Sequence, residues 1–380
     1  MECCSAVSSP PFAPRGPDDW RWWIALRMVQ GVGPVVYHSL LRVFHEPRQV
    51  FAAGLDALEC CGLRPEVARA VHGFDRWAEV DRDLDRLQRA GAVLVTWHDL
   101  HYPSLLRHTH DPPPFLYMLG EMHPADTLSV AVVGSRHPTA YGLRMARELT
   151  VGLVQFGFTI VSGLARGIDA AAHWSALKEG GRTIAVLGSG IDVIYPPEHR
   201  ALARKIVTQG ALLSELSMGA QPDAENFPAR NRIISGMTRG TVVVEAAEKS
   251  GSLITAHAAA EQGREVFAVP GPVSERSKGT HKLIRSGAKL TECARDVIEE
   301  IAPQLLATQV TPSVRQRSLP LEARPLVELL RTQPLHVDEL IARSGQPATQ
   351  VLATLLDLEL QGVVQQLPGK CFALVESGSG

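Results

Sequence analysis

Six short apolar runs alternate with helical patterns between residues 128 and 271, and this alternation limits the possible folds more than any other feature. The runs lie at residues 130–133, 158–161, 184–187, 211–213, 242–244 and 266–269. Strands that are hydrophobic along their whole length are covered on both faces, as in a parallel sheet whose strands are joined by helices. The predicted fold class is therefore α/β, with a doubly wound, Rossmann-like parallel sheet in a domain spanning residues 128–301.

The rest of the chain divides into segments of different composition. Residues 1–19 are rich in Pro and Ser and are expected to be disordered. Residues 20–90 have helical periodicity around Gly-containing turns near Gly31 and Gly62, which resemble helix-hairpin-helix motifs. Such turns also join helices for purely structural reasons, so DNA contact there stays open.

Proline marks the next boundaries along the chain. Residues 91–127 contain one strand-like run followed by dense proline, which indicates a connector. Residues 302–323 lose periodicity and are interpreted as a linker. Residues 324–376 have the helix and strand order of a winged helix. Its third helix, at residues 348–360, carries no Lys or Arg for base edges, so a protein-binding role is favoured there over reading of duplex DNA.

Charge and cysteine content restrict the class of protein. The net charge is −2, so a nucleic-acid binder would need a local basic patch. The six cysteines have neither the CxxC spacing of zinc sites nor a secreted disulfide framework, so no metal site and a cytoplasmic location are expected. No run of about 18 apolar residues indicates a membrane span.

Polar, glycine-rich segments follow four of the predicted strands. They lie at residues 134–136, 162–169, 188–190 and 250–255, and their candidate site residues are Ser135, Arg136, Gly163, Arg166 and Gly167. In doubly wound sheets, ligands bind beyond the carboxyl ends of the strands. Short turns favour glycine in any case, but the convergence of four such segments predicts an anion-binding crevice. Neither a GxGxxG fingerprint nor a Walker motif is present, so no nucleotide cofactor is expected.

Residues 226–236 place aromatic, cationic and amide side chains around a predicted helix start, with Pro228 suited to the first helical position. The candidate ligand-binding residues are Asn226, Phe227, Arg230, Asn231 and Arg232. Helix N-termini attract anions, and Arg guanidiniums match phosphate oxygens. The alternative is structural: Phe227 would fill core and the arginines would form salt bridges.

The densest basic stretch spans residues 276–289, has no acidic residue, and includes Lys282. Because it follows the last predicted core strand, contact with a phosphate backbone is favoured over a merely solvated face. An enzymatic alternative uses Glu245, at the end of a strand, with the loop from Ser250 to Ser252, as in nucleotide-cleaving Rossmann enzymes such as phosphoribohydrolases. In the structural alternative to that site, Ser250 or Ser252 caps a helix.

Assembled, these motifs resemble the DNA-processing protein A family (DprA, also called Smf). The resemblance rests on residues 102–103, 111–113, 133–136, 162–169, 195–196, 226–236 and 250–255. It implies a non-enzymatic protein that binds incoming single-stranded DNA in natural transformation and helps load RecA recombinase for DNA recombination. It also implies a Rossmann-type homodimer with a helical, SAM-like N-terminal domain and, in some members, a winged helix.

The resemblance also assigns individual residues. Arg136 would hold phosphate, Phe227 would stack against a base, and Arg200 would match a basic position after Tyr195-Pro196. Many members carry Lys three residues before the Phe, where this chain has Ala224. Arg230 or Lys282 is expected to compensate for that missing charge.

Overall fold

The computed structural model describes residues 16–309, 323–330, 333–360, 364–367 and 369–374. These residues belong to two compact units, Met1–Leu306 and Ala307–Gly380. The predicted disorder at residues 1–19 and the predicted linker at 302–323 fall largely outside the described residues. At the edges of these two segments, α1 already begins at Pro17, and Pro303–Gln309 forms helix α15.

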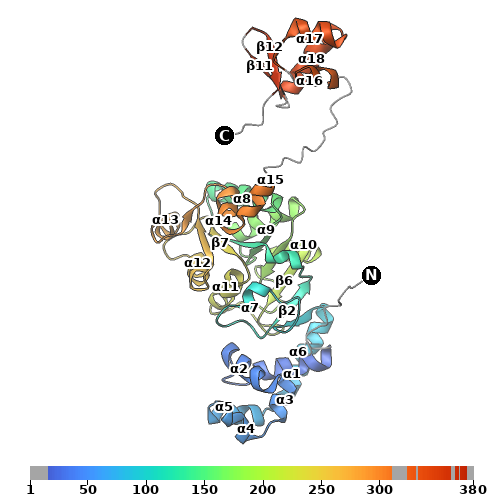
Figure 1. The fold of residues 1–380 in the computed structure, drawn as a ribbon. Coiled ribbons are helices and arrows are strands. Elements are labelled where there is room, and N and C mark those ends of the chain that lie inside the picture. Colours follow the sequence, from blue (N-terminus) through green and yellow to red (C-terminus); the bar gives the residue numbers. More distant parts are fainter. Residues whose placement is uncertain (1–15, 310–322, 331–332, 361–363, 368, 375–380) are drawn as a thin grey trace, which may run out of the picture. The chain divides into compact units, whose positions relative to one another are not determined.

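Residues 17–90 form six short helices, which confirms the predicted helical character of this region, and they lie together (blue in Figure 1). They are α1 (Pro17–Met28), α2 (Pro34–Phe44), α3 (Pro47–Ala52), α4 (Leu55–Cys60), α5 (Pro65–His72) and α6 (Trp77–Ala90). Four begin with proline, whose missing N–H costs nothing at a first helical position. Gly31, at φ 86°, lies in the α1–α2 turn, and a Cβ there would meet Val67 of α5 at 2.8 Å. The two predicted hairpins therefore pack on each other.

A nine-stranded sheet forms the centre of the first unit, in the order β1-β2-β6-β5-β4-β3-β7-β8-β9. The strands are β1 (Val93–Thr96), β2 (Phe115–Gly120), β3 (Ser129–Val133), β4 (Thr159–Ser162), β5 (Thr183–Val186), β6 (Gly210–Ser214), β7 (Gly240–Val243), β8 (Glu265–Ala268) and β9 (Lys289–Leu290). Strands β3 to β9 run parallel, so the predicted doubly wound sheet is confirmed.

The segment predicted as a connector adds two strands to this sheet: β1, which matches its one strand-like run, and β2, which was not predicted. Strand β2 pairs antiparallel with both β1 and β6. The proline-rich residues 112–114 end directly before Phe115, the first residue of β2. The prolines therefore precede the strand and remove none of its ladder donors, which is why their density gave the wrong indication.

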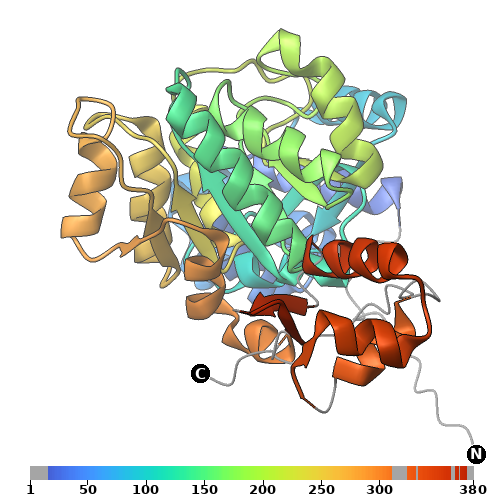
Figure 2. The same cartoon turned by 90° about the horizontal axis from the view of Figure 1, so that it is seen from above.

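Alternate strand residues point to opposite faces of the sheet, and helices cover both. One core joins Val130 and Val132 to α8, α9 and α14, and the opposite core joins Ala131 and Val133 to α11 and α12. Figure 2 shows α8 and α9 side by side across the sheet. The remaining elements of the unit are α7 (Ser104–Arg107), α8 (Ala140–Gln155), α9 (Ile168–Lys178), α10 (Arg200–Gln209), α11 (Asn226–Gly236), α12 (Gly251–Glu261), α13 (Lys278–Arg285), α14 (Ala294–Ile301) and the 3-10 helices η1 (Pro124–Thr127) and η2 (Pro197–His199).

The N-terminal helices share a core with the sheet and are tied to it by a buried carboxylate. Asp83 of α6 accepts a hydrogen bond from the Tyr117 hydroxyl of β2 at 2.5 Å and from the Met218 N–H at 2.8 Å. Burial raises the pKa of Asp83, and these two hydrogen bonds act against that rise. The helical group is thereby fixed to the edge that carries β2 and β6.

The second unit has the predicted winged-helix pattern and its own core around Leu326, Leu340 and Leu355. Its elements are α16 (Arg324–Leu330), β10 (Leu335–His336), α17 (Val337–Ser344), α18 (Ala348–Leu360), β11 (Val364–Leu367) and β12 (Cys371–Leu374). The three strands form one antiparallel sheet. In the part of the chain that the structure describes, no helix is long and apolar enough to cross a membrane.

Candidate functional site

A crevice of about 600 Å³ opens beyond the carboxyl end of β3. From β3 the chain builds β4, β5 and β6 toward one side and then crosses over to β7, β8 and β9 on the other. This reversal of strand order is the place where open α/β sheets bind ligands. The lining includes Gly134, Ser135, Arg136, Ala165, Asp169, Ala224, Phe227, Arg230, Asn231, Lys249, Ser250, Gly251, Ser252 and Thr255. The predicted convergence of loops is therefore found for the segments after β3, β4 and β7.

One face of α11 forms a wall of the crevice. Phe227, Arg230, Asn231 and Ile234 all line it. Their spacing of three, four and seven residues is that of a single helical face. The helix begins at Asn226 and not, as predicted, at Pro228, which is its third residue. Proline is tolerated there because the N–H groups of the first turn have no partner within the helix.

The Phe227 ring is half-buried and lies between cations. The Arg136 guanidinium carbon is 5.2 Å from the ring centroid, and that of Arg230 is 5.8 Å away. The Tyr195 ring, 37% exposed, lies 6.1 Å from it in a tilted arrangement. Arg136 itself is exposed at the crevice. An aromatic surface flanked by guanidiniums suits a ligand with both a planar ring and a phosphate.

Arg230 is buried and links α11 to the loop after β4 and to the end of β5. Its Nη1 donates to the carbonyl oxygens of Gly163, at 2.7 Å, and Val186. Burial lowers the pKa of Arg230 to about 10, the nearby charge of Asp169 opposes this change, and Arg136 adds to it. Arg230 therefore stays charged at neutral pH. Gly163 must be glycine because a Cβ would occupy the space of the Arg230 guanidinium.

Asp169 shapes the loop after β4 from inside. Its carboxylate accepts hydrogen bonds from the N–H groups of Gly163, at 3.1 Å, and Ala165, at 3.4 Å. Burial raises the pKa of Asp169, and Arg230 acts in the opposite direction. Gly167, at φ 78°, ends the loop where a Cβ would collide with the Ser135 carbonyl oxygen. The predicted loop residues Gly163 and Gly167 thus support the crevice without lining it.

The N-terminus of α12 also opens into the crevice. Ser250 caps this helix, with its Oγ accepting a hydrogen bond from the Ser252 N–H at 3.4 Å. The cap confirms the structural alternative for Ser250. Beside it lies Lys249, an exposed cation that lines the crevice and that was not among the predicted residues. Its position directly before the serine-glycine loop was the available signal.

Five of the predicted side chains do not line the crevice. Arg166 pairs with Glu198 at 2.5 Å, Arg200 lines a separate hollow, and the Asn226 amide donates to the Gln221 carbonyl oxygen. Lys282 is exposed on α13. DNA contact by these four side chains remains a prediction without support from the crevice geometry.

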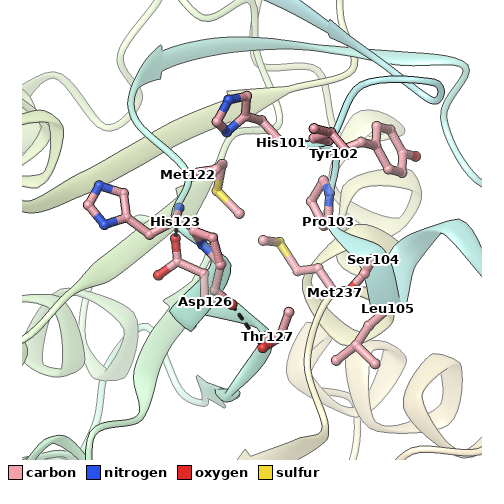
Figure 3. A pocket seen from close by; sticks show the side chains of 12 residues that line it. His101, Tyr102, Pro103, Ser104, Leu105, Met122, His123, Asp126, Thr127 and Met237 are labelled. Atoms are coloured by element: carbon pink, nitrogen blue, oxygen red, sulfur yellow. Dashed lines mark hydrogen bonds between the residues drawn. The ribbon is translucent and has the colours of Figure 1, made fainter. Parts of the chain in front are cut away.

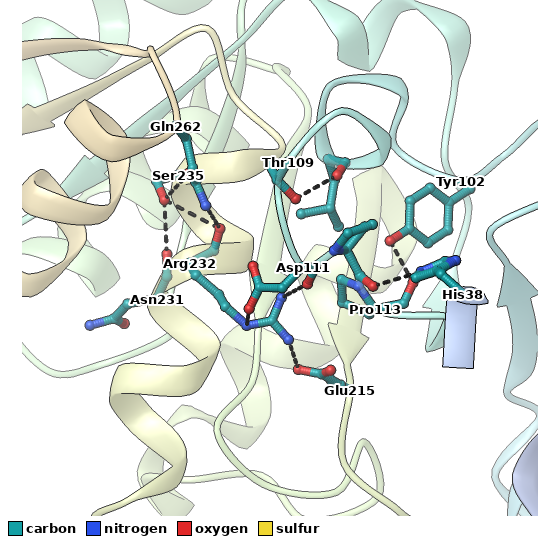
Figure 4. A network of polar contacts seen from close by, with 12 residues as sticks. His38, Tyr102, Thr109, Asp111, Pro113, Glu215, Asn231, Arg232, Ser235 and Gln262 are labelled. Carbon is teal, nitrogen blue, oxygen red and sulfur yellow. Dashed lines mark hydrogen bonds and ion pairs between the residues drawn. The ribbon is translucent and has the colours of Figure 1, made fainter. Parts of the chain in front are cut away.

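Arg232, the fifth of these residues, points away from the crevice into a polar network (Figure 4). It donates to Glu215 Oε2 and to the Asp111 carbonyl oxygen, both at 2.6 Å. The structural interpretation therefore holds for Arg232. The next two carbonyls of the same loop accept from other elements: Pro112 from His38 of α2 at 3.0 Å, and Pro113 from the Tyr102 hydroxyl at 2.7 Å.

Glu245, the residue of the enzymatic alternative, is buried outside the crevice. Its carboxylate accepts hydrogen bonds from the Thr139 N–H at 3.1 and 3.2 Å and from the Thr139 hydroxyl at 2.5 Å. It lines a separate cavity of about 150 Å³. In the structure, the Glu245 carboxylate orients Thr139, which caps α8.

Another hollow, of about 230 Å³, lies between Tyr102 and Met237 (Figure 3). Its carboxylate, Asp126, already accepts from the His123 N–H, the Thr159 hydroxyl and the Arg182 guanidinium. The hollow therefore offers a ligand mainly apolar contacts. Across the described ranges, no group of three or more His, Cys, Asp and Glu residues could hold a metal ion.

Fold and site together define the class: a Rossmann-like protein with a cationic, aromatic crevice at its topological switch point. A family model described as DNA recombination-mediator protein A matches residues 93–302, and one described as DprA winged helix domain matches residues 310–370. Protein Smf of Synechocystis sp. is 36% identical in an alignment that covers 92% of this chain and 97% of that protein. The chain belongs to the DNA-processing protein A family, DprA or Smf, as the motifs indicated.

Two solved structures of the family resemble this one. That of DNA processing protein A from Streptococcus pneumoniae has a TM-score of 0.66 and 36% identity, covering 74% of this chain and 98% of its own. That of DNA processing protein A from Helicobacter pylori, described with a single-stranded DNA binding mode, has a TM-score of 0.51 and 29% identity, covering 57% and 96%. The Rossmann-like fold is common to all three.

Proposed function

We propose that this protein binds single-stranded DNA in the crevice and helps load RecA recombinase onto it during natural transformation. The observation that carries the proposal is the Phe227 ring flanked by Arg136 at the switch point. A sequence-tolerant single-strand binder needs an aromatic surface for bases and cations for the backbone, and each stacked base is worth roughly 1–3 kcal/mol. The single-stranded DNA binding described for the Helicobacter pylori relative supports the same ligand.

The proposal includes a non-enzymatic role, without cofactor or metal, in the cytoplasm. The enzymatic alternative would need an acid in the crevice, and the Glu245 carboxylate is instead engaged by Thr139. Ser250, the other residue of that alternative, caps α12. These contacts favour a binding site over a nucleotide-cleaving site. A homodimer is proposed from the family resemblance alone.

Salt-titrated binding of oligonucleotides tests the proposal. We expect Arg136→Ala and Phe227→Ala each to weaken single-strand binding by about tenfold, the loss of one phosphate contact or one stacked base. Arg136→Ala should also flatten the salt dependence, because one fewer counterion is released. Arg89→Ala, at an exposed ion pair on α6, is the matched control and should bind like the wild type.

Competition experiments distinguish a site for single-stranded DNA from a site for mononucleotides. Duplex DNA and mononucleotides should displace the oligonucleotide poorly. Strong displacement by mononucleotides, together with release of free base from them, would replace the binding proposal with the enzymatic one. RecA loading is then measured by strand-exchange assays on DNA coated with a single-strand-binding protein.

A further inference from the structure

A further cavity, of about 380 Å³, lies between α2 and the segment around α7, and it shares no lining residue with the crevice. We name it the histidine pocket. It is lined by Val35, His38, Ser39, Leu41, Arg42, His45, Trp97, His98, Arg107, Thr109, His110 and Pro112. Two arginines and four histidines thus meet at one cavity, and no carboxylate lines it. On a chain of net charge −2, such a concentration of cationic groups marks a site for an anion.

Aromatic contacts order the interior of the pocket. The His38 ring lies 5.1 Å from Trp97 and edge-on to it, and Trp97 lies 5.2 Å from His98 in the same manner. The Arg107 guanidinium carbon is 5.9 Å from the Trp97 ring centroid, and its Nη2 donates to the Asp99 carbonyl oxygen at 2.7 Å. Because His38 Nε2 contacts the Pro112 carbonyl oxygen, that nitrogen carries the proton and donates.

Burial and, to a smaller extent, neighbouring basic groups disfavour the charged forms of two histidines in the pocket. Burial lowers the pKa of His38, and Arg42 lowers it further, although the hydrogen bond to Pro112 raises it. The pKa of His98 is lowered by burial, then by His38, Arg107 and His45, and only Asp99 raises it. The Asp99 carboxylate itself accepts hydrogen bonds from the N–H and hydroxyl of Thr96. A bound anion would relieve this repulsion among positive groups.

We propose that the histidine pocket binds a phosphate group carried by a nucleotide or a nucleic-acid strand, and that binding strengthens as its histidines gain protons. Guanidinium groups match phosphate oxygens in geometry, and Trp97 offers a ring surface for a base. The choice of ligand rests on the proposed function of the crevice, but the residues are different. Loop 109–113 lies between the two sites, joined to α2 through His38 and to α11 through Arg232.

The direction of the pH dependence follows from proton linkage. Without ligand, His38 and His98 have pKa values below the usual 6.5, so they are neutral at physiological pH. A phosphate favours their charged forms, and its binding therefore takes up protons. Affinity should rise as the pH falls below about 6.5 and should be weakest in alkaline solution.

The test compares two double variants on matched helices. Arg42→Gln/His45→Gln removes two exposed basic side chains of the pocket at the C-terminal end of α2, and Arg69→Gln/His72→Gln removes the same pair at the same spacing from α5. Oligonucleotide binding is measured at about pH 6 and about pH 8 at constant ionic strength. We expect the pocket variant to lose about tenfold in affinity at the lower pH, with a smaller loss at the higher pH and no loss in the control.

The inference is overturned if the pocket variant, the control and the wild type bind the oligonucleotide equally at both pH values and the pocket histidines also respond to neither inorganic phosphate nor a mononucleotide. Inorganic phosphate and a mononucleotide, followed through the histidine C–H resonances, separate the sources of the phosphate: shifts with either ligand but no effect on oligonucleotide binding assign the pocket to a small molecule. If Arg136→Ala leaves DNA binding intact while the pocket variant loses it, the proposed crevice function fails and this inference stands.

Discussion

Arg230 and Arg232 lie two residues apart on α11, and their side chains leave the helix in different directions because successive residues are turned by about 100°. Phe227, Arg230 and Asn231 share the crevice face, whereas Arg232 reaches Glu215 on the far side. Crevice-lining residues and structural residues are therefore mixed along this stretch of the sequence. The helical spacing of the residues distinguishes the two groups, and this spacing can be counted in the sequence.

Lys249 and Ala224 both line the crevice, and Arg230 is already engaged by the Gly163 carbonyl oxygen. We therefore expect Lys249 to supply the charge that Ala224 lacks. We predict that Lys249→Ala weakens single-strand binding by about threefold to tenfold and reduces the salt slope by about one counterion. Lys282→Ala, outside the crevice, should change neither quantity. If salt-titrated anisotropy shows that Lys282→Ala weakens binding and Lys249→Ala does not, the compensating charge comes from Lys282 on α13.

The Arg232 network predicts a stability effect in place of a binding effect. Arg232→Met leaves Glu215, whose side chain is 11% exposed, without its cation, and should lower the free energy of unfolding by about 2 kcal/mol. The matched control is Arg166→Met, whose pair with Glu198 is about half exposed and should change the stability little, because solvent screens exposed pairs. Urea unfolding of both variants measures the difference, and equal losses would contradict it.

At the scale of elements, helix α9 is joined to the sheet by a buried histidine that is neutral at physiological pH. His173 is fully buried, and its Nδ1 lies 2.7 Å from the Thr183 hydroxyl. That hydroxyl donates to the Ile160 carbonyl oxygen, so the histidine must be the donor. Burial, with smaller effects of His199 and Arg230, lowers the pKa of His173 to about 3.

This pKa predicts loss of stability in mild acid. Above about pH 6.5 the imidazole is neutral in both states, but between about 6.5 and 3 only the unfolded chain binds the proton. Lowering the pH from about 7 to about 5 should therefore cost about 2 kcal/mol through this residue. His173→Gln should flatten the pH dependence of the urea midpoint by that amount, and the exposed His72→Gln should not. Parallel profiles for all three proteins would contradict the assignment.

The sequence predicted those elements whose composition reflects their environment in the fold. All six apolar runs overlap strands β3 to β8, because those strands are buried on both faces. Strand β2 was missed because residues 112–114 suggested irregular structure, and β9 because its two residues, Lys289 and Leu290, carry no pattern.

At the scale of the molecule, the crevice could be predicted because parallel strands end at one edge and their loops must meet there. The identity of the side chains that line the crevice could not be predicted. Arg230 is held by the carbonyls of Gly163 and Val186, which belong to the loop after β4 and to the end of strand β5. The histidine pocket likewise joins α2 to residues more than fifty positions later. Such contacts exist only once the chain is folded.

The second unit has features that suit the binding of a protein partner. Its core is separate from those of the first unit, and α18 carries no Lys or Arg. It does expose Leu352 and Leu356, which are 51% and 56% accessible and one helical turn apart. An exposed apolar pair at this spacing suits the docking of a protein partner.

We therefore predict that a chain ending at Gln309 binds single-stranded DNA within about twofold of the wild type, yet loads RecA less well. Leu352→Ser/Leu356→Ser in the full chain should reproduce the loading defect without the truncation, because it removes the apolar pair alone. The exposed Gln365→Ser/Gln366→Ser on β11 is its control. If truncation abolishes DNA binding as well, the second unit belongs to the DNA footprint. If loading survives both changes, the recombinase docks on the first unit, and the winged helix serves another partner.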